Sequence, residues 1–221
     1  KKMVGVTLEN NLLTNREFYN DDEIGYKPLP GNYLHEITFK NEIICSAKYT
    51  ITKDRIRLTP NNPKDLKSKN LIIINFFGGS YAFGHCVNDD ETLPYYLNSF
   101  GKNFLVNNLS VSGYGVSQAL YILSNMKNKT KNVKIINILL TGTWHNVRSL
   151  CLPDYTRGSP KYKINKSNTG VILTGKCQSF FDRFPKPVKK LLWAVLYRSK
   201  IKFLIEDYLI NKKYYNNIDL Y

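Results

Sequence analysis

The strongest signal in the hydrophobic pattern is the apolar run LIIINFF over residues 71–77. A run of this kind is typical of a strand buried on both faces, as in a parallel sheet. It ends at Gly78 and Gly79, which leave the backbone open to a ligand, and Ser80 follows. A hydroxyl just beyond the carboxyl end of a strand suits a nucleophile. An ordinary strand-to-loop turn also accounts for Gly-Gly-Ser, so both interpretations stay open at this point.

Two later segments repeat the order of strand, polar loop and helix. Strands are expected at 104–106, before the loop NNLSVSGYG, and at 133–140, before the polar loop TGTWHN. Helices are expected at 92–100, behind a run of acidic residues, and at 116–126. Three such βα units predict an open, mainly parallel sheet covered by helices, with a crevice above the strand ends.

The chain before this core has a different pattern. The first 20 residues show no period, and the segment 21–33 is turn-rich and predicts little regular structure. Alternation between 33 and 58 predicts two or three short antiparallel strands. We therefore divide the chain into a β-rich lead packed on the core, residues 1–68, and an α/β core, residues 69–221.

The C-terminal third predicts a hairpin around residues 167–170 and a helix over 188–209. One side of this helix is basic. It is either the solvated face of a covering helix or a surface for peripheral membrane contact.

Composition narrows the function classes. The formal net charge is +15, but the basic residues are scattered among Asn and Ile, which argues against a nucleic-acid partner. The four cysteines are far apart and form no C-x-x-C pair, which predicts buried thiols rather than a zinc site or a disulfide framework. They are Cys45, Cys86, Cys151 and Cys177. The sequence has no long apolar span and no signal-peptide pattern. Its first residues are not a natural start. An upstream segment that exports or anchors the protein therefore stays an open alternative, and so does the compartment.

Two blocks resemble the SGNH (GDSL-type) hydrolases. IIINFFGGSYAFGHCVNDDETLP is similar to the family's first block, and FLVNNLSVSGYGVSQALYIL is similar to its second, Val-x-Asn-x-x-x-x-Gly followed by a helix. The lead segment EIGYKPLPG also resembles some bacterial members, and the likeness covers roughly residues 21–210. It implies a three-layer α/β/α, flavodoxin-like fold and an esterase that needs neither metal nor cofactor.

By this resemblance Ser80 is the nucleophile, and the backbone N–H groups of Ser80 and Gly113 form the oxyanion hole. Such a hole needs donors fixed before the reaction, and a glycine leaves room for substrate. A simple tight turn also accounts for Gly113. Asn108 matches the asparagine of the second block, where it is expected to shape the loop.

Three departures from the family pattern stand out. Gly79 replaces the Asp of the Gly-Asp-Ser triplet, and Trp144 stands where the third block has its oxyanion-hole Asn. Asn146 is the candidate replacement if the loop is longer. His145 is expected to orient the loop by a hydrogen bond, as in relatives with an Asp-His-x-x-Arg variant, which it and Arg148 resemble.

The third departure is the missing base, because no histidine follows His145 and Asp219 has no His behind it. Either the chain stops before the base-bearing loop, or it keeps the fold without the chemistry. His35 and His85 are alternative bases only if folding brings one to the hydroxyl, and otherwise are structural.

The sequence thus predicts a serine esterase acting on O-acyl groups of a bacterial carbohydrate or lipid, with a small-molecule or glycan ester as partner. The alternative is an inactive carbohydrate- or acyl-binding protein of the same fold.

Overall fold

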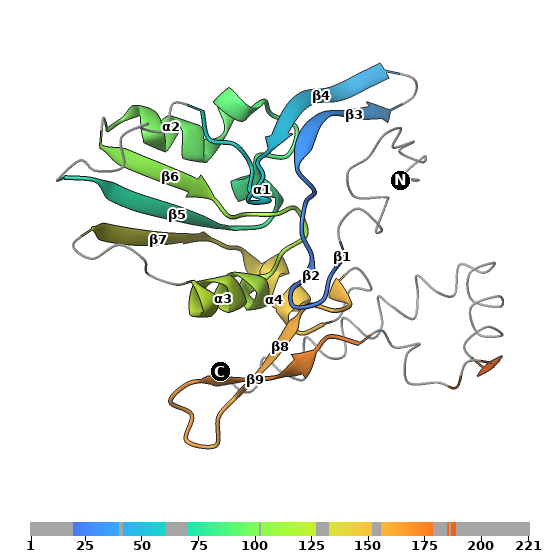
Figure 1. Ribbon diagram of the computed structural model, residues 1–221. Helices are drawn as coiled ribbons and strands as arrows, with labels where there is room; N and C mark the ends of the chain where they lie inside the picture. The colour runs from blue at the N-terminus through green and yellow to red at the C-terminus, as the bar shows by residue number, and fades with distance from the viewer. Residues whose placement is uncertain are drawn as a thin grey trace.

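A computed structural model of the protein describes residues 20–39, 42–60, 70–101, 103–126, 133–151 and 156–178, together with residues 185, 187 and 188. Its centre is a sheet flanked by short helices, and a long hairpin projects from it (Figure 1). The architecture is mixed α/β.

The central sheet is parallel, as the apolar runs predict. It contains β5 (Ile72–Gly78), β6 (Phe104–Asn108) and β7 (Lys134–Leu140) in the order β6-β5-β7. Apolar side chains of β5 and β6, buried at Ile74, Phe76 and Val106, make the core of this sheet. The chain therefore passes from the middle strand to one edge and then crosses to the other edge.

Short helices connect these strands. The first is the single turn α1 (Ser80–Phe83), and the next are η2 (Asp89–Glu91) and α2 (Leu93–Ser99), which ends the β5–β6 connection. Thr92 caps α2, because its Oγ1 accepts from the Tyr95 N–H at 3.2 Å.

The other two helices follow β6 and β7. Helix α3 (Val116–Asn125) confirms the prediction for 116–126 to within one residue. Helix α4 (Thr143–Ser149) occupies the segment that was predicted to be a polar loop, and that prediction was wrong.

The N-terminal lead forms the antiparallel pair that the alternation predicts. Strands β3 (Gly31–Phe39) and β4 (Glu42–Ile51) make the projecting hairpin, preceded by the two-residue strands β1 (Asn20–Asp21) and β2 (Gly25–Tyr26). Isolated bridges from Ile51 to Arg57 and from Arg57 to Asn108 join the hairpin to the end of β6. One face of β4 packs its buried side chains on Phe83 of α1.

The predicted C-terminal hairpin is also present, as β8 (Pro160–Ile164) and β9 (Val171–Lys176). The predicted helix over 188–209 lies, from residue 189 onward, outside the described residues, as do residues 1–19. Within the described segments, no helix combines the length and apolarity that crossing a bilayer requires.

The cysteines are not buried thiols. Cys45 on β4 is bonded to Cys86 in the loop after α1, and Cys151 is bonded to Cys177, so the prediction was wrong. The separations of 41 and 26 residues leave no local spacing to recognise. In the chain-entropy account, loops of these lengths stabilise the fold by about 3.5–4 kcal/mol each.

A ladder of asparagine side chains crosses the parallel sheet. Asn75, buried on the middle strand, is in register with Asn107 on β6 and Asn137 on β7. The Asn107 Nδ2 donates to the Asn75 Oδ1 at 2.9 Å, and the Asn75 Nδ2 donates to the Asn137 Oδ1 at 3.0 Å. A strand displaced by one residue would turn its asparagine to the other face, so the ladder fixes the register.

We predict that Asn75→Ala lowers the free energy of unfolding by about 1–3 kcal/mol, because the substitution removes both hydrogen bonds of the buried Asn75 and leaves the half-buried Asn107 donor without its acceptor. Urea unfolding followed by far-UV circular dichroism measures it. Asn137→Ala is the matched control at the exposed end of the ladder and should cost less. Equal losses in the two variants would contradict the role given to the buried residue.

Candidate functional site

The carboxyl ends of all three parallel strands meet around Gly78 and Gly79. The Leu109 N–H donates to the Phe76 carbonyl at 2.9 Å, and the Val111 N–H donates to the Gly78 carbonyl at 3.2 Å, so the loop after β6 continues alongside β5. The end of β7 is equally close, because a Cβ at Gly78 would lie 2.7 Å from the Leu140 carbonyl oxygen. Glycine at 78 is what permits this approach.

Ser80 stands at this junction as the first residue of α1 and is half-buried, so solvent reaches it. The first N–H groups of a helix have no partner within it. In the part of the chain that the structure describes, neither the Ser80 N–H nor the Gly113 N–H donates a hydrogen bond. Both predicted oxyanion donors are therefore available.

Gly113 lies in a turn that neighbouring side chains hold in place. Its φ of +89° is in the region that favours glycine, and the Tyr114 N–H closes the turn onto the Val111 carbonyl at 3.0 Å. The Tyr26 hydroxyl donates to the Ser112 carbonyl at 2.8 Å, and the Tyr114 hydroxyl donates to the Tyr26 carbonyl at 2.6 Å. The lead thus fixes the turn from its outer side.

His145 and Arg148 bring helix α4 against the same junction. Three residues apart on one helical face, they place His145 Nε2 and Arg148 Nη1 each 2.7 Å from where a Cβ on Gly79 would be. The Gly142 N–H donates to His145 Nδ1 at 2.9 Å, and Arg148 Nη1 donates to the Tyr114 carbonyl at 3.0 Å. The loop-orienting hydrogen bond predicted for His145 is confirmed.

The glycine that replaces the family's Asp has a spatial reason. The side chain of an Asp at residue 79 would enter the space that His145 and Arg148 occupy here. Burial, and then the charge of Arg148, hold the pKa of His145 below its ordinary value. Since Nδ1 accepts from Gly142, the hydrogen-bond pattern assigns the proton of the neutral ring to Nε2.

Asn146 is exposed on α4, one residue beyond His145. Successive residues of a helix are turned by about 100°, which directs Asn146 away from the face shared by His145 and Arg148. Its part in the oxyanion hole stays a prediction. Trp144, 45% exposed, lies instead beside Tyr81, which is 71% exposed, with 5.6 Å between ring centroids.

Arg57 holds the loop that follows Ser80. Its side chain is buried and donates to the carbonyls of Phe83, Gly84 and Val87, while its Nε contacts Asp89 Oδ1 at 3.0 Å. The guanidinium carbon also lies 4.3 Å from the centroid of the Tyr49 ring. These contacts satisfy a charge that burial would otherwise penalise.

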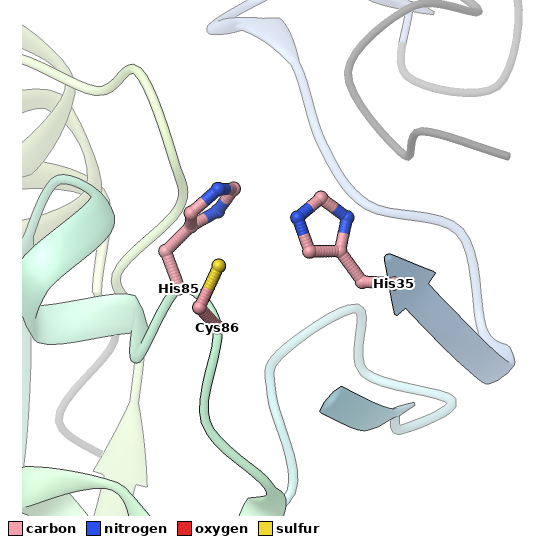
Figure 2. A group of neighbouring side chains, drawn as sticks. All are labelled: His35, His85 and Cys86. Carbon is pink, nitrogen blue, oxygen red and sulfur yellow. The ribbon is translucent and has the colours of Figure 1, made fainter. Parts of the chain in front are cut away.

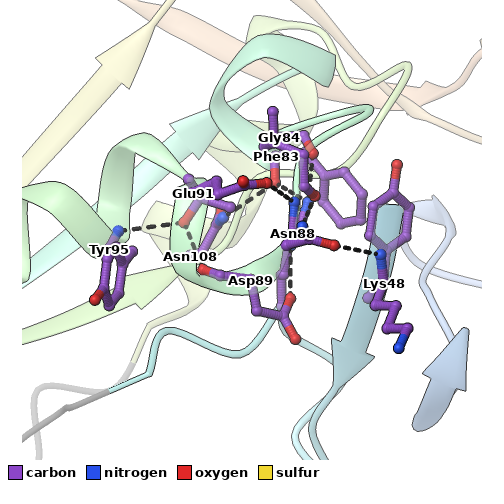
Figure 3. Close-up of polar contacts among 12 residues, drawn as sticks. Lys48, Phe83, Gly84, Asn88, Asp89, Glu91, Tyr95 and Asn108 are labelled. Atoms are coloured by element: carbon purple, nitrogen blue, oxygen red, sulfur yellow. Dashed lines mark hydrogen bonds and ion pairs between the residues drawn. The ribbon is translucent and has the colours of Figure 1, made fainter. Parts of the chain in front are cut away.

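Asn108 supports the same loop from the sheet side. Its Nδ2 donates to the Ala82 carbonyl at 3.2 Å, and its Oδ1 accepts from the Ser110 N–H at 3.2 Å, as expected of a loop-shaping residue. Farther along, Asn88 Oδ1 accepts from the Lys48 N–H at 2.9 Å, tying the loop to the hairpin (Figure 3).

His35 and His85 are neighbours. The loop after α1 doubles back at Gly84, so that the His85 N–H donates to the Ser80 carbonyl at 2.9 Å. The ring of His35 on β3 lies 4.6 Å from that of His85, beside Cys86 (Figure 2). Burial and then His85 lower the pKa of His35 to about 4, and burial and then Arg57 lower that of His85. Ser112 Oγ lies 3.4 Å from His85 Nδ1.

Comparison of the chain with models of protein families, with curated proteins and with solved structures gives no match.

Sequence reasoning missed two functional features. Arg57 belongs to a stretch interpreted only by its alternation, and an Arg is ordinarily exposed. The pairing of His35 with His85 joins residues from separate elements, which no local spacing reveals. The segment RIRL alternates Arg55 and Arg57 with Ile56 and Leu58 and does not distinguish the buried Arg57 from the exposed Arg55, so it carries no signal for the first.

We predict that Arg57→Lys lowers the free energy of unfolding by about 3 kcal/mol or more. A lysine ammonium cannot reproduce the planar set of N–H donors of the guanidinium, so buried carbonyls would be left without a hydrogen bond. Thermal and urea unfolding measure this loss. The exposed Arg55 gives the matched control Arg55→Lys, which should change stability by less than about 0.5 kcal/mol. A near-neutral Arg57→Lys would contradict the supporting role.

We also predict a pH effect at His145. Its folded-state pKa is depressed, so its contribution to stability is complete above its unfolded pKa of about 6.5 and declines as the pH falls below that value. His145→Gln should therefore show a smaller loss of unfolding free energy between pH 7 and pH 5 than the unsubstituted protein. Urea unfolding across this range measures the difference, and parallel pH profiles would count against it.

Proposed function

We propose that the protein is a serine esterase of the SGNH type, acting on O-acyl groups of a carbohydrate or lipid, with Ser80 as nucleophile. The observation that carries the proposal is the meeting of three strand ends at Gly78 and Gly79, beside a solvent-accessible Ser80.

The topology supports a crevice at this place. The connections from β5 to β6 and from β6 to β7 run in opposite directions along the sheet. With right-handed crossovers they lie on opposite faces, which gives a three-layer α/β/α arrangement of the flavodoxin-like kind. Ligands of such sheets bind outside the carboxyl ends of the strands, where the strand order reverses. Here that point is between β5 and β7, next to Ser80.

The chemistry requires fixed donors for the developing oxyanion. The unengaged N–H groups of Ser80 and Gly113 meet this need, and Gly113 is held by the tyrosine contacts of the lead. Attack by the Ser80 Oγ on the ester carbonyl forms an acyl-enzyme and releases the alcohol, and water then releases the acid.

A base must take the proton of Ser80. His85 is the imidazole whose loop returns to Ser80, and its lowered pKa keeps it neutral and able to accept a proton at pH 7. Its Nδ1 faces Ser112 Oγ, which makes Ser112 the competing nucleophile.

Two disulfides also bear on where the enzyme works. Disulfides persist mainly in oxidising compartments, which favours an exported protein over a cytosolic one.

A fluorophosphonate activity probe tests the proposal, because it phosphonylates only an activated serine hydroxyl. We expect labelling of the protein, loss of labelling in Ser80→Ala, and retention in Ser112→Ala. Labelling that persists in Ser80→Ala would dismiss the assignment, and its loss in Ser112→Ala alone would transfer the role to Ser112. Circular dichroism of both variants separates a lost nucleophile from a lost fold.

The exposed Tyr81 and Trp144 support a second candidate, a carbohydrate-binding protein without turnover, because aromatic rings beside the crevice suit stacking on sugar faces. Trp144→Ala should weaken binding of an acylated oligosaccharide about tenfold or more, measured by calorimetry with Ser80→Ala to suppress hydrolysis. Tyr96→Ala removes a comparably exposed aromatic and is the control. Equal affinities for all variants would remove the sugar-stacking argument.

A further inference from the structure

The His35–His85 pair adjoins a disulfide that no part of the proposed esterase chemistry uses. One ligand atom each from His35, His85 and Cys86 lie within 4.8 Å of one another, and the side chains point into a common space (Figure 2). The Cys86 sulfur is bonded to Cys45, so these atoms form a complete ligand set only after reduction.

Cys45 would be the fourth member of the set. The register of the hairpin places His35 opposite Ala47 and Ile37 opposite Cys45. Residues two apart on a strand, and residues directly opposite, share a face. His35 and Cys45 therefore project from the same face of β3 and β4, toward the loop that carries His85 and Cys86.

His35 itself requires an explanation. It is 1% exposed, and neither of its ring nitrogens has a hydrogen-bond partner among the described residues. A buried polar atom without a partner costs about 1–3 kcal/mol, and one of the two nitrogens lies within 4.8 Å of the Cys86 sulfur and of a His85 nitrogen. A metal ion that accepts the lone pair of an imidazole nitrogen would offset this cost.

We propose that reduction of the Cys45–Cys86 disulfide creates a binding site for a zinc-class divalent metal, with His35, His85, Cys45 and Cys86 as ligands. Two thiolates and two imidazoles are a tetrahedral set suited to Zn²⁺. Bond lengths of about 2.0–2.3 Å place the ligand atoms of such a centre about 3.3–3.8 Å apart, so side-chain shifts of about 1 Å bring the atoms of His35, His85 and Cys86 to that spacing. The inference does not depend on esterase activity, although it gives His85, the base proposed for Ser80, a second role in the reduced form.

The charge balance favours the reduced form. The buried guanidinium of Arg57 donates to the carbonyl of Gly84, the residue before His85, so an additional uncompensated cation here is unfavourable. Two thiolates cancel the charge of a divalent metal, whereas the disulfide form offers only neutral nitrogens. Metal binding is therefore expected to depend on the oxidation state of the cysteines.

The reaction balances with a trialkylphosphine as reductant. The phosphine supplies two electrons and the S–S bond breaks, while water supplies the oxygen of the phosphine oxide and the protons of the two thiols. Each thiol releases its proton on binding the metal.

Cobalt(II) is the probe, because tetrahedral thiolate coordination gives intense visible bands and a sulfur-to-cobalt charge-transfer band. The full chain carrying Cys151→Ser and Cys177→Ser keeps only the proposed pair. We expect this protein to bind one Co²⁺ after phosphine treatment and to show no comparable binding before it. Added Zn²⁺ should displace the Co²⁺ and abolish the bands. The matched protein carrying Cys45→Ser and Cys86→Ser, which keeps the other pair, should give no such bands.

His35→Gln and His85→Gln, made in the chain that keeps Cys45 and Cys86, should each weaken Co²⁺ binding at least about tenfold. If that chain does not fold, the wild-type sequence compared with His35→Gln carries the same test. The proposal is overturned if reduction produces no charge-transfer band, if the two cysteine variants give equal bands, if either histidine is dispensable, or if the oxidised protein binds equally well.

Discussion

The buried guanidinium of Arg57 is the contact on which the arrangement of the site depends. The backbone of Arg57 bridges the hairpin of the lead to the end of β6, and its guanidinium donates to the carbonyls of the loop after Ser80. A buried charge is tolerated only when its donors are matched, and here a carboxylate, three carbonyls and aromatic faces match them. If the loop moved, the buried guanidinium would lose its hydrogen-bond partners.

The lead is consequently part of the site rather than an appendage. Ile24 packs on Val111 and Tyr114, and Tyr26 holds the turn that contains Gly113. On the other side, the Cys45–Cys86 disulfide and the Asn88 contact tie the loop after Ser80 to β4. Each of the two loops expected to hold the oxyanion is therefore braced from outside the parallel sheet, which is how backbone donors are kept in position before a reaction.

Much of the fold could be predicted because its signals are local. The apolar runs gave the three parallel strands, and the period of 116–126 gave α3. Helix α4 was missed because its start is a glycine with a His three residues later, where the usual capping pattern has Glu or Gln. The disulfides and the His35–His85 contact were beyond reach, because they join residues whose proximity is created only by the tertiary fold.

The central claim is that an ester carbonyl can sit between the Ser80 hydroxyl and the N–H groups of Ser80 and Gly113. A crystal structure of the protein after reaction with a phosphonate ester tests it most directly. The account predicts phosphorus bonded to the Ser80 Oγ, with the phosphoryl oxygen accepting from both N–H groups. An adduct on another residue, or a phosphoryl oxygen directed away from the turn at Gly113, would contradict it.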